Sequence, residues 1–183
     1  MDLKQYLTWA LAMGITSSSL VLAQPAQAGR LFARGANGAA GAYGYQGQYG
    51  GRAGARALGY NAGAGIRGGQ WAGPNGGSAQ SAGAFGYKRG VGAARGSAWQ
   101  AQAPNGASGS GYSKNVYNAQ TGQGTRSSSE QFQTASGKSY GYDGTTNYTK
   151  GQGATSTIDT QNKGDYTVDW QKGQKPIVTQ EQP

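Results

Sequence analysis

Apolar and polar residues alternate with a period of two in the C-terminal part of the chain. Tyr166, Val168 and Trp170 fall on one side of an extended segment and the intervening Thr and Asp on the other, which is the pattern of a half-buried strand. Residues 154–161 are predicted to pair with this strand through a hairpin in which Gly164 takes a left-handed conformation. Further short strands are predicted at 131–135, 138–142 and 145–150.

A loose tandem repeat of about 30 residues organises the chain. Each unit begins with Tyr followed by a Gly-x-Gly, and the four units start at Tyr60, Tyr87, Tyr117 and Tyr148. Midway through each unit lies a turn signal, at residues 74–76, 104–106, 136–137 and 162–164. Asn-Gly in the first two supplies the positive φ angles of a tight hairpin turn. The fold class expected is therefore mostly β with extensive disorder, built from tandem β-hairpin repeats.

Composition divides the chain into five segments. Lys4, the interrupted apolar stretch 7–22 and Ala26-Gln27-Ala28 predict a signal peptide over 1–28, cleaved between Ala28 and Gly29. Residues 29–59 are rich in Gly, Ala, Tyr and Arg, and are expected to form a flexible, disordered arm because glycine loses much entropy on ordering. The remaining segments expected are Gly-rich weak β repeats at 60–116, Thr/Tyr-rich β-hairpin repeats at 117–179 and a tail at 180–183.

Aliphatic residues are too sparse for an ordinary globular core. After residue 28 the share of Leu, Ile, Val, Phe and Met lies well below the roughly one-fifth that folded globules need. Tyr and Trp partly replace them, so any core is expected to be thin and aromatic. The chain has no Cys, and its stability must come from strand pairing, repetition or assembly.

Charge is segregated along the chain, whose net charge is +9. Every charged residue from Gly29 to Ser129 is basic, whereas the remainder is nearly balanced. Basic exported segments meet anionic polymers, and spaced arginines also keep a Gly-rich chain soluble. The candidate anionic-polymer contacts are Arg30, Arg34, Arg52, Arg56, Arg67, Lys88, Arg89 and Arg95.

The chain lacks the side chains on which most enzymes rely. It contains neither His nor Cys, which removes the commonest general base, the main zinc ligands and the usual nucleophile pairs. Asp165 and Asp169 would share a strand face, but a chain this poor in core can hardly desolvate one of them. We therefore expect no enzyme activity, catalytic residue, cofactor or metal site.

The turn motifs Gly73-Pro74-Asn75-Gly76 and Ala103-Pro104-Asn105-Gly106, with the linking residues 118–126, resemble a diffuse group of exported bacterial Gly-rich repeat proteins. The resemblance covers about residues 60–170. It implies an envelope or extracellular location and no particular activity. The abundance of Gln and Gly also gives a mechanistic analogy to the curli subunits, although the spacing of the units varies and the curli residue ladder is missing.

The leading functional hypothesis is an exported structural or adhesive protein of the cell surface or extracellular matrix. Its partners would be anionic polysaccharide, the envelope surface or, nonspecifically, extracellular DNA, with self-association left open. The alternative is a soluble cationic protein that binds anionic surface polymers or membranes, as antimicrobial proteins do. No dedicated nucleic-acid recognition and no transmembrane segment after processing are expected, and the expected location is extracellular, cell-surface or periplasmic.

Overall fold

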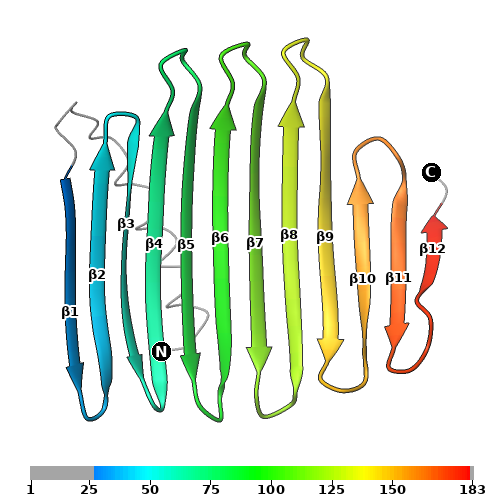
Figure 1. Cartoon of the computed structure of the whole chain (residues 1–183). Helices are drawn as coiled ribbons and strands as arrows, with labels where there is room; N and C mark the ends of the chain where they lie inside the picture. The colour runs from blue at the N-terminus through cyan, green and yellow to red at the C-terminus, as the bar shows by residue number, and fades with distance from the viewer. Residues whose placement is uncertain (1–26, 182–183) are drawn as a thin grey trace.

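The computed structural model describes residues 27–181, which form one antiparallel sheet. Its twelve strands lie in the order of the sequence, each hydrogen-bonded to the next (Figure 1). The strands are β1 (Gln27–Gly35), β2 (Gly38–Gly47), β3 (Gly50–Gly59), β4 (Ala62–Ala72), β5 (Ser78–Lys88), β6 (Gly92–Gln102), β7 (Ser108–Asn118), β8 (Gln123–Gln133), β9 (Ser139–Thr149), β10 (Gly153–Thr160), β11 (Asp165–Gln171) and β12 (Ile177–Glu181). The tandem-hairpin architecture predicted from the repeat is thus confirmed.

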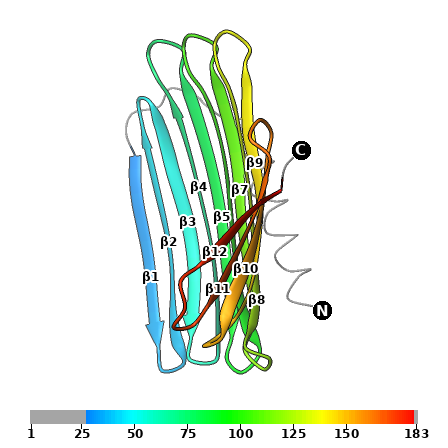
Figure 2. The same ribbon diagram turned by 90° about the vertical axis from the view of Figure 1, so that its right-hand side faces the viewer.

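The sheet is a single layer. Each strand contacts only its neighbours in the sequence, and the view turned by 90° shows no second layer of strands over the first (Figure 2). The last strands are rotated relative to the first in that view, as the twist of paired strands requires. Among the described residues, the buried hydrophobic ones are only Ala84 and Ala94. The expected thin aromatic core is therefore wrong, because in a single layer the rings lie on the surface.

The expectation of a flexible arm at 29–59 is also wrong. These residues form most of β1 and all of β2 and β3, which pair residue by residue, for example Tyr43 with Gly54. A continuous ladder on both sides of β2 and β3 satisfies their backbone groups, which offsets the entropy lost by glycine. The prediction of a signal peptide lies almost wholly outside the described residues.

Other predicted boundaries also differ from those in the structure, because pairing between neighbouring strands decides where each strand begins and ends. The division at 116/117 falls inside β7, and the expected tail at 180–183 begins inside β12. The segments 138–142 and 145–150 form one strand, β9, rather than two. The hairpin between 154–161 and Tyr166–Gln171 is confirmed, with Ser156 opposite Val168. Strand length is set by hydrogen-bond pairing with both neighbouring strands. The alternation of apolar and polar residues along one strand carries no information about that pairing.

The turn at the middle of each repeat is built around one left-handed glycine. Gly76, Gly106, Gly137 and Gly164 have φ angles of 89°, 84°, 81° and 80°. In the loop at 103–107, Gly106 N donates to the Ala103 carbonyl at 3.0 Å, so Pro104 and Asn105 occupy the centre of the turn. No described residue other than glycine has a positive φ. The Pro-Asn-Gly signals therefore mark a turn closed by glycine, and not a two-residue turn with Asn in the left-handed region.

The Gly-x-Gly that opens three of the repeats forms the turn at the other end of the sheet. Gly90, Gly122 and Gly151 have φ angles of 73°, 70° and 77°. The second glycine of each pair lies where a Cβ would collide with the adjacent strand, as at Gly92 against the Tyr117 carbonyl. The first unit differs. Its Gly63 and Gly65 lie inside β4, while Tyr60 lies in the preceding bend, so its motif does not share the register of the others.

We predict that Gly106→Ala destabilises the fold by about 1–2 kcal/mol, the cost of a left-handed conformation in an L-residue. No atom lies within 4 Å of a Cβ built at Gly106, so the effect isolates the backbone conformation. The control is Gly86→Ala inside β5, where the nearest atom would be the Gly63 carbonyl oxygen at 3.8 Å. This control should be neutral or stabilising. Equal urea midpoints for the two variants would contradict the assigned turn.

Candidate anionic-polymer interface

Nearly all aromatic side chains of the strands lie on one face of the sheet. Residues directly opposite each other on paired strands share a face, and side chains alternate between faces along each strand. Following the pairs from strand to strand defines an aromatic face that holds Phe32, Tyr43, Tyr45, Trp71, Phe85, Tyr87, Trp99, Tyr117, Phe132, Tyr140, Tyr142, Tyr148, Tyr166 and Trp170. The opposite, small-residue face is mostly Gly and Ala in β1–β6 and mostly Ser, Thr and Gln in the later strands, with Tyr112 as its strand aromatic.

Several of these rings lie over a glycine directly opposite on the neighbouring strand. A Cβ at Gly54 would approach the Tyr43 ring to 2.7 Å, and one at Gly65 would approach the Phe85 ring to 2.5 Å. Tyr148 covers Gly124 in the same way. A ring over a strand glycine shields backbone that no side chain covers. Glycine is therefore part of the aromatic face, since a larger residue would push the ring away.

Three of the four repeat tyrosines form one row on this face. Tyr87 and Tyr117 both lie opposite Ala93, while Tyr117 and Tyr148 both lie opposite Gly124. The rings of Tyr117 and Tyr148 stack in parallel with their centroids 6.3 Å apart. Tyr148 Oη donates a hydrogen bond to Asn115 Oδ1 at 3.1 Å. The repeated Tyr thus fixes the lateral packing of alternate strands.

Every strand arginine lies on the aromatic face. Six of the candidate contacts lie together there: Arg30, Arg34, Arg52, Arg56, Arg67 and Arg95. The other two lie elsewhere. Lys88 is on the small-residue face, opposite Ala62 and Gly92, and Arg89 lies in the turn after β5, its guanidinium carbon 4.5 Å from the centroid of the Tyr60 ring.

An open groove of about 800 Å³ crosses β1–β8 on this face. One wall is the row that contains Arg30, Tyr43 and Arg67, and the other is the row that contains Phe32, Arg56, Phe85, Arg95 and Arg126. Arg126 was missed as a candidate contact, and period-two alternation counted from the turn at 119–122 would have placed it opposite Asn115, which in turn pairs with Arg95. Glu130 is the one acid on the aromatic face within the described strands β1–β9, and it lies outside the groove lining.

The groove presents cations and rings to the same ligand. A guanidinium binds carboxylate, sulfate or phosphate groups through paired hydrogen bonds. Neighbouring strands are about 4.8 Å apart, and the groove arginines lie on β1, β3, β4, β6 and β8. The sheet therefore offers a line of cations, one or two strands apart, that runs across the strands, with Phe32, Tyr43 and Phe85 among them.

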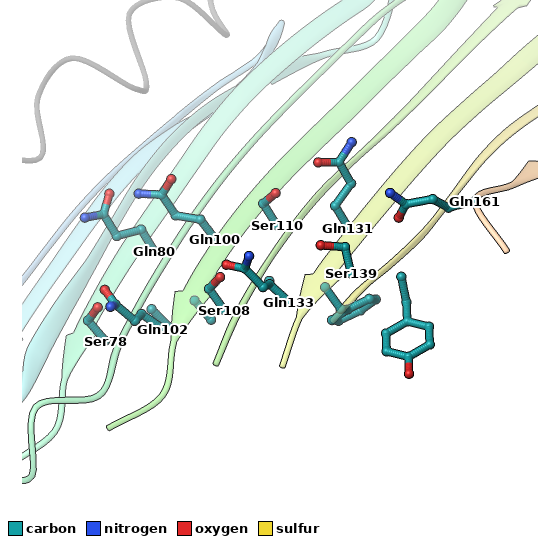
Figure 3. A pocket seen from close by; sticks show the side chains of 15 residues that line it. Ser78, Gln80, Gln100, Gln102, Ser108, Ser110, Gln131, Gln133, Ser139 and Gln161 are labelled. Carbon is teal, nitrogen blue, oxygen red and sulfur yellow. The ribbon is translucent and has the colours of Figure 1, made fainter. Parts of the chain in front are cut away.

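A second groove of about 570 Å³ lies at one end of the small-residue face, over β5–β9. Its side chains are uncharged, and Gln80, Gln100 and Gln131 stand in a line on one side of the sheet, beside Gln102 and Gln133 (Figure 3). Amide groups both donate and accept hydrogen bonds. Sequence reasoning missed this alignment because it needs the register of five strands. The two faces thus differ in charge as well as in side-chain size.

The acidic residues considered for catalysis are engaged within the sheet. Thr155 Oγ1 donates to Asp169 Oδ1 at 2.7 Å, and the backbone N–H of Thr160 donates to Asp165 Oδ1 at 3.3 Å. Both contacts join β11 to β10, so the two carboxylates have a structural role. Between residues 27 and 181 there is no group of three or more His, Cys, Asp or Glu side chains arranged to hold a metal ion.

We predict that Tyr148→Ala lowers the free energy of unfolding by about 1–2 kcal/mol, because it removes a cross-strand ring pair and a hydrogen bond. Tyr112→Ala is the matched control, since Tyr112 lies on the opposite face with 51% of its surface exposed, and it should cost less than about 0.5 kcal/mol. Urea denaturation followed by circular dichroism measures both. A larger loss for Tyr112→Ala would contradict the role given to the Tyr row.

Comparison with known proteins gives no relative for this chain. No family model, curated protein or solved structure matches it. In the part of the chain that the structure describes, no helix is long and apolar enough to cross a membrane.

Proposed function

We propose that this chain is an exported structural or adhesive protein of the cell surface or extracellular matrix, which binds a linear anionic polysaccharide along its aromatic face. One observation carries the proposal: every strand arginine lies on the same face as nearly all strand aromatics. A basic charge that served only solubility would be spread over both faces. The segregation supports a binding surface.

The shape of the groove supports a linear polymer as the ligand. The groove is open and crosses eight strands, from Arg30 on β1 to Arg126 on β8. A small anion would need a few convergent donors in an enclosed site, whereas these cations are spread along a line. A polymer with repeated acidic groups can contact several of them at once, so weak individual contacts combine into useful affinity.

An extracellular polymer is favoured as the ligand, because the predicted signal peptide would carry the protein out of the cytoplasm. The exposed rings add a second kind of contact. Tyr43 and Tyr45 have 45% and 50% of their surface exposed and lie beside the arginine rows. Flat aromatic surfaces pack against the apolar faces of sugar rings by the same burial of apolar area that operates in protein cores. Sheet and groove together supply a scaffold with many weak contacts.

We predict that the variant Arg56→Gln/Arg67→Gln/Arg95→Gln binds alginate, a linear polymer of uronic acids, about tenfold or more weakly than the wild type. Exposed ion pairs contribute roughly 0.2–1 kcal/mol each, and about 1.4 kcal/mol is a tenfold change in affinity. Isothermal titration calorimetry at low and physiological salt measures the effect, which should shrink at high salt because screening weakens exposed pairs.

The matched control is Lys88→Gln/Arg89→Gln/Lys114→Gln, which removes the same charge from the small-residue face and a turn. It should change the affinity less than about twofold, since the loss of net charge alone acts only at long range. Equal losses in the two variants would show that net charge, and not the aromatic face, binds the polymer. Leakage of anionic lipid vesicles by the wild type at similar concentrations would favour the antimicrobial-like alternative.

A further inference from the structure

Within residues 27–181 the sheet is open, so two of its strands have an edge that no other described strand pairs with. Among the described strands, β1 and β12 each pair with a single neighbour, and they lie at opposite ends of the strand order (Figure 1). An edge strand presents a row of free N–H and C=O groups, which another strand can complete. Proteins usually protect such edges with charges, bulges or a covering segment.

The two edges carry the most exposed aliphatic side chains of the described residues. The exposed fraction is 77% for Leu31 on β1, and 64% and 63% for Ile177 and Val178 on β12. Phe32, next to Leu31, is 59% exposed. Leaving such side chains in water forgoes roughly 25 cal/mol for each Å² of apolar surface that could be buried. Both edges are therefore incomplete in backbone pairing and in apolar burial.

These exposed residues stand level with one another across the whole sheet. The row of directly opposed residues that begins at Phe32 ends at Val178, and the next row runs from Leu31 to Thr179. The pairings contain no interruption between these ends. Two copies placed side by side without any offset along the strands would therefore bring Val178 of one copy next to Phe32 of the other.

We propose that copies of this chain associate head to tail, β12 of one copy pairing with β1 of the next as an antiparallel ladder. The register is Ile177 with Ala33, Val178 with Phe32, Thr179 with Leu31 and Gln180 with Arg30. Strand direction alternates through the sheet, so β1 is antiparallel to β12 and the added copy keeps the pattern. Each pair also joins residues of the same face, so the aromatic faces of successive copies are continuous.

The alternative pairing of β1 with β1 of a second copy is less favourable. Centred on Phe32, a symmetric antiparallel pair would place Arg30 opposite Arg34, and like charges directly opposite each other are destabilising. In the head-to-tail register Arg30 faces the neutral Gln180 instead. A heterologous contact of this kind does not close, so it builds a filament. Pro176, which precedes the five-residue β12, limits the new ladder to that strand and keeps each contact weak.

This inference deepens the proposed function, because a filament repeats the arginine groove along its length and so supplies the multivalency that adhesion needs. It does not depend on polysaccharide binding, since the contact uses only the two edges. Failure of the polymer-binding experiment would leave the filament intact, and failure of the filament would leave the groove of a single copy intact.

The absence of Cys from the natural chain makes disulfide trapping a clean test. Opposed residues of an antiparallel ladder have Cα atoms about 4.5 or 5.5 Å apart, within the range that a disulfide spans. The full chain with Phe32→Cys/Val178→Cys should give a ladder of covalent dimers, trimers and larger species on a non-reducing gel after mild oxidation. The register-shifted pair Phe32→Cys/Gln180→Cys is the control and should give at least tenfold less of these species.

Three results would overturn the proposal. Equal ladders from both pairs would mean random collision, and a predominant dimer from Phe32→Cys alone would mean that β1 pairs with β1. Without cysteines, Leu31→Lys/Val178→Lys should abolish sedimentable assemblies that the wild type forms at the same concentration, because lysine on an edge strand opposes pairing. Circular dichroism and a urea midpoint close to that of the wild type confirm that the sheet of this variant is folded. Assemblies that persist in the folded lysine variant would also exclude the edges as the contact.

Discussion

The backbone ladder is the interaction on which everything else in this structure depends. A single-layer sheet has no second layer against which to bury side chains, and Ala84 and Ala94 are the only hydrophobic residues buried in the described part. Pairing without interruption therefore has to hold the strands together, supported by side chains within each face. This explains why β4–β9 all have eleven residues, since a longer or shorter strand would leave backbone groups unpaired.

Glycine and aromatic residues complement each other within this ladder. Where Gly54, Gly65 or Gly124 leaves a strand without a side chain, a ring from the next strand lies over it. Glycine in the turns has a different role, because Gly90 and Gly106 supply the left-handed conformation that reverses the chain. The high glycine content, which on composition alone suggests disorder, is in this way compatible with a regular sheet.

The same constraint leaves the molecule with two accessible faces and two accessible edges. The aromatic face combines arginines such as Arg56, Arg67 and Arg95 with rings around one groove, while the opposite face has a groove of neutral amides. In a globular protein, one face of a sheet would pack against the core. Here both faces of the described sheet are available to partners. Because Phe32 and Val178 lie at the two ends of one row of paired residues, the edges can also contact another copy of the chain.

Sequence alone determined the strand type, the turn positions and the repeat, because period-two alternation around Tyr166–Trp170 and glycines such as Gly164 act locally. Prediction from the sequence was wrong where the structure depends on pairing between different segments of the chain. Residues 29–59 carry few aliphatic residues, yet they form strands because their backbone groups pair with those of neighbouring strands. Tyr60 begins a unit whose register differs from the rest. Nor could it assign Lys88 and Arg95 to opposite faces, since a shift of one residue in pairing reverses every side chain. Only the tertiary structure fixes that register, because it results from all eleven strand pairings together.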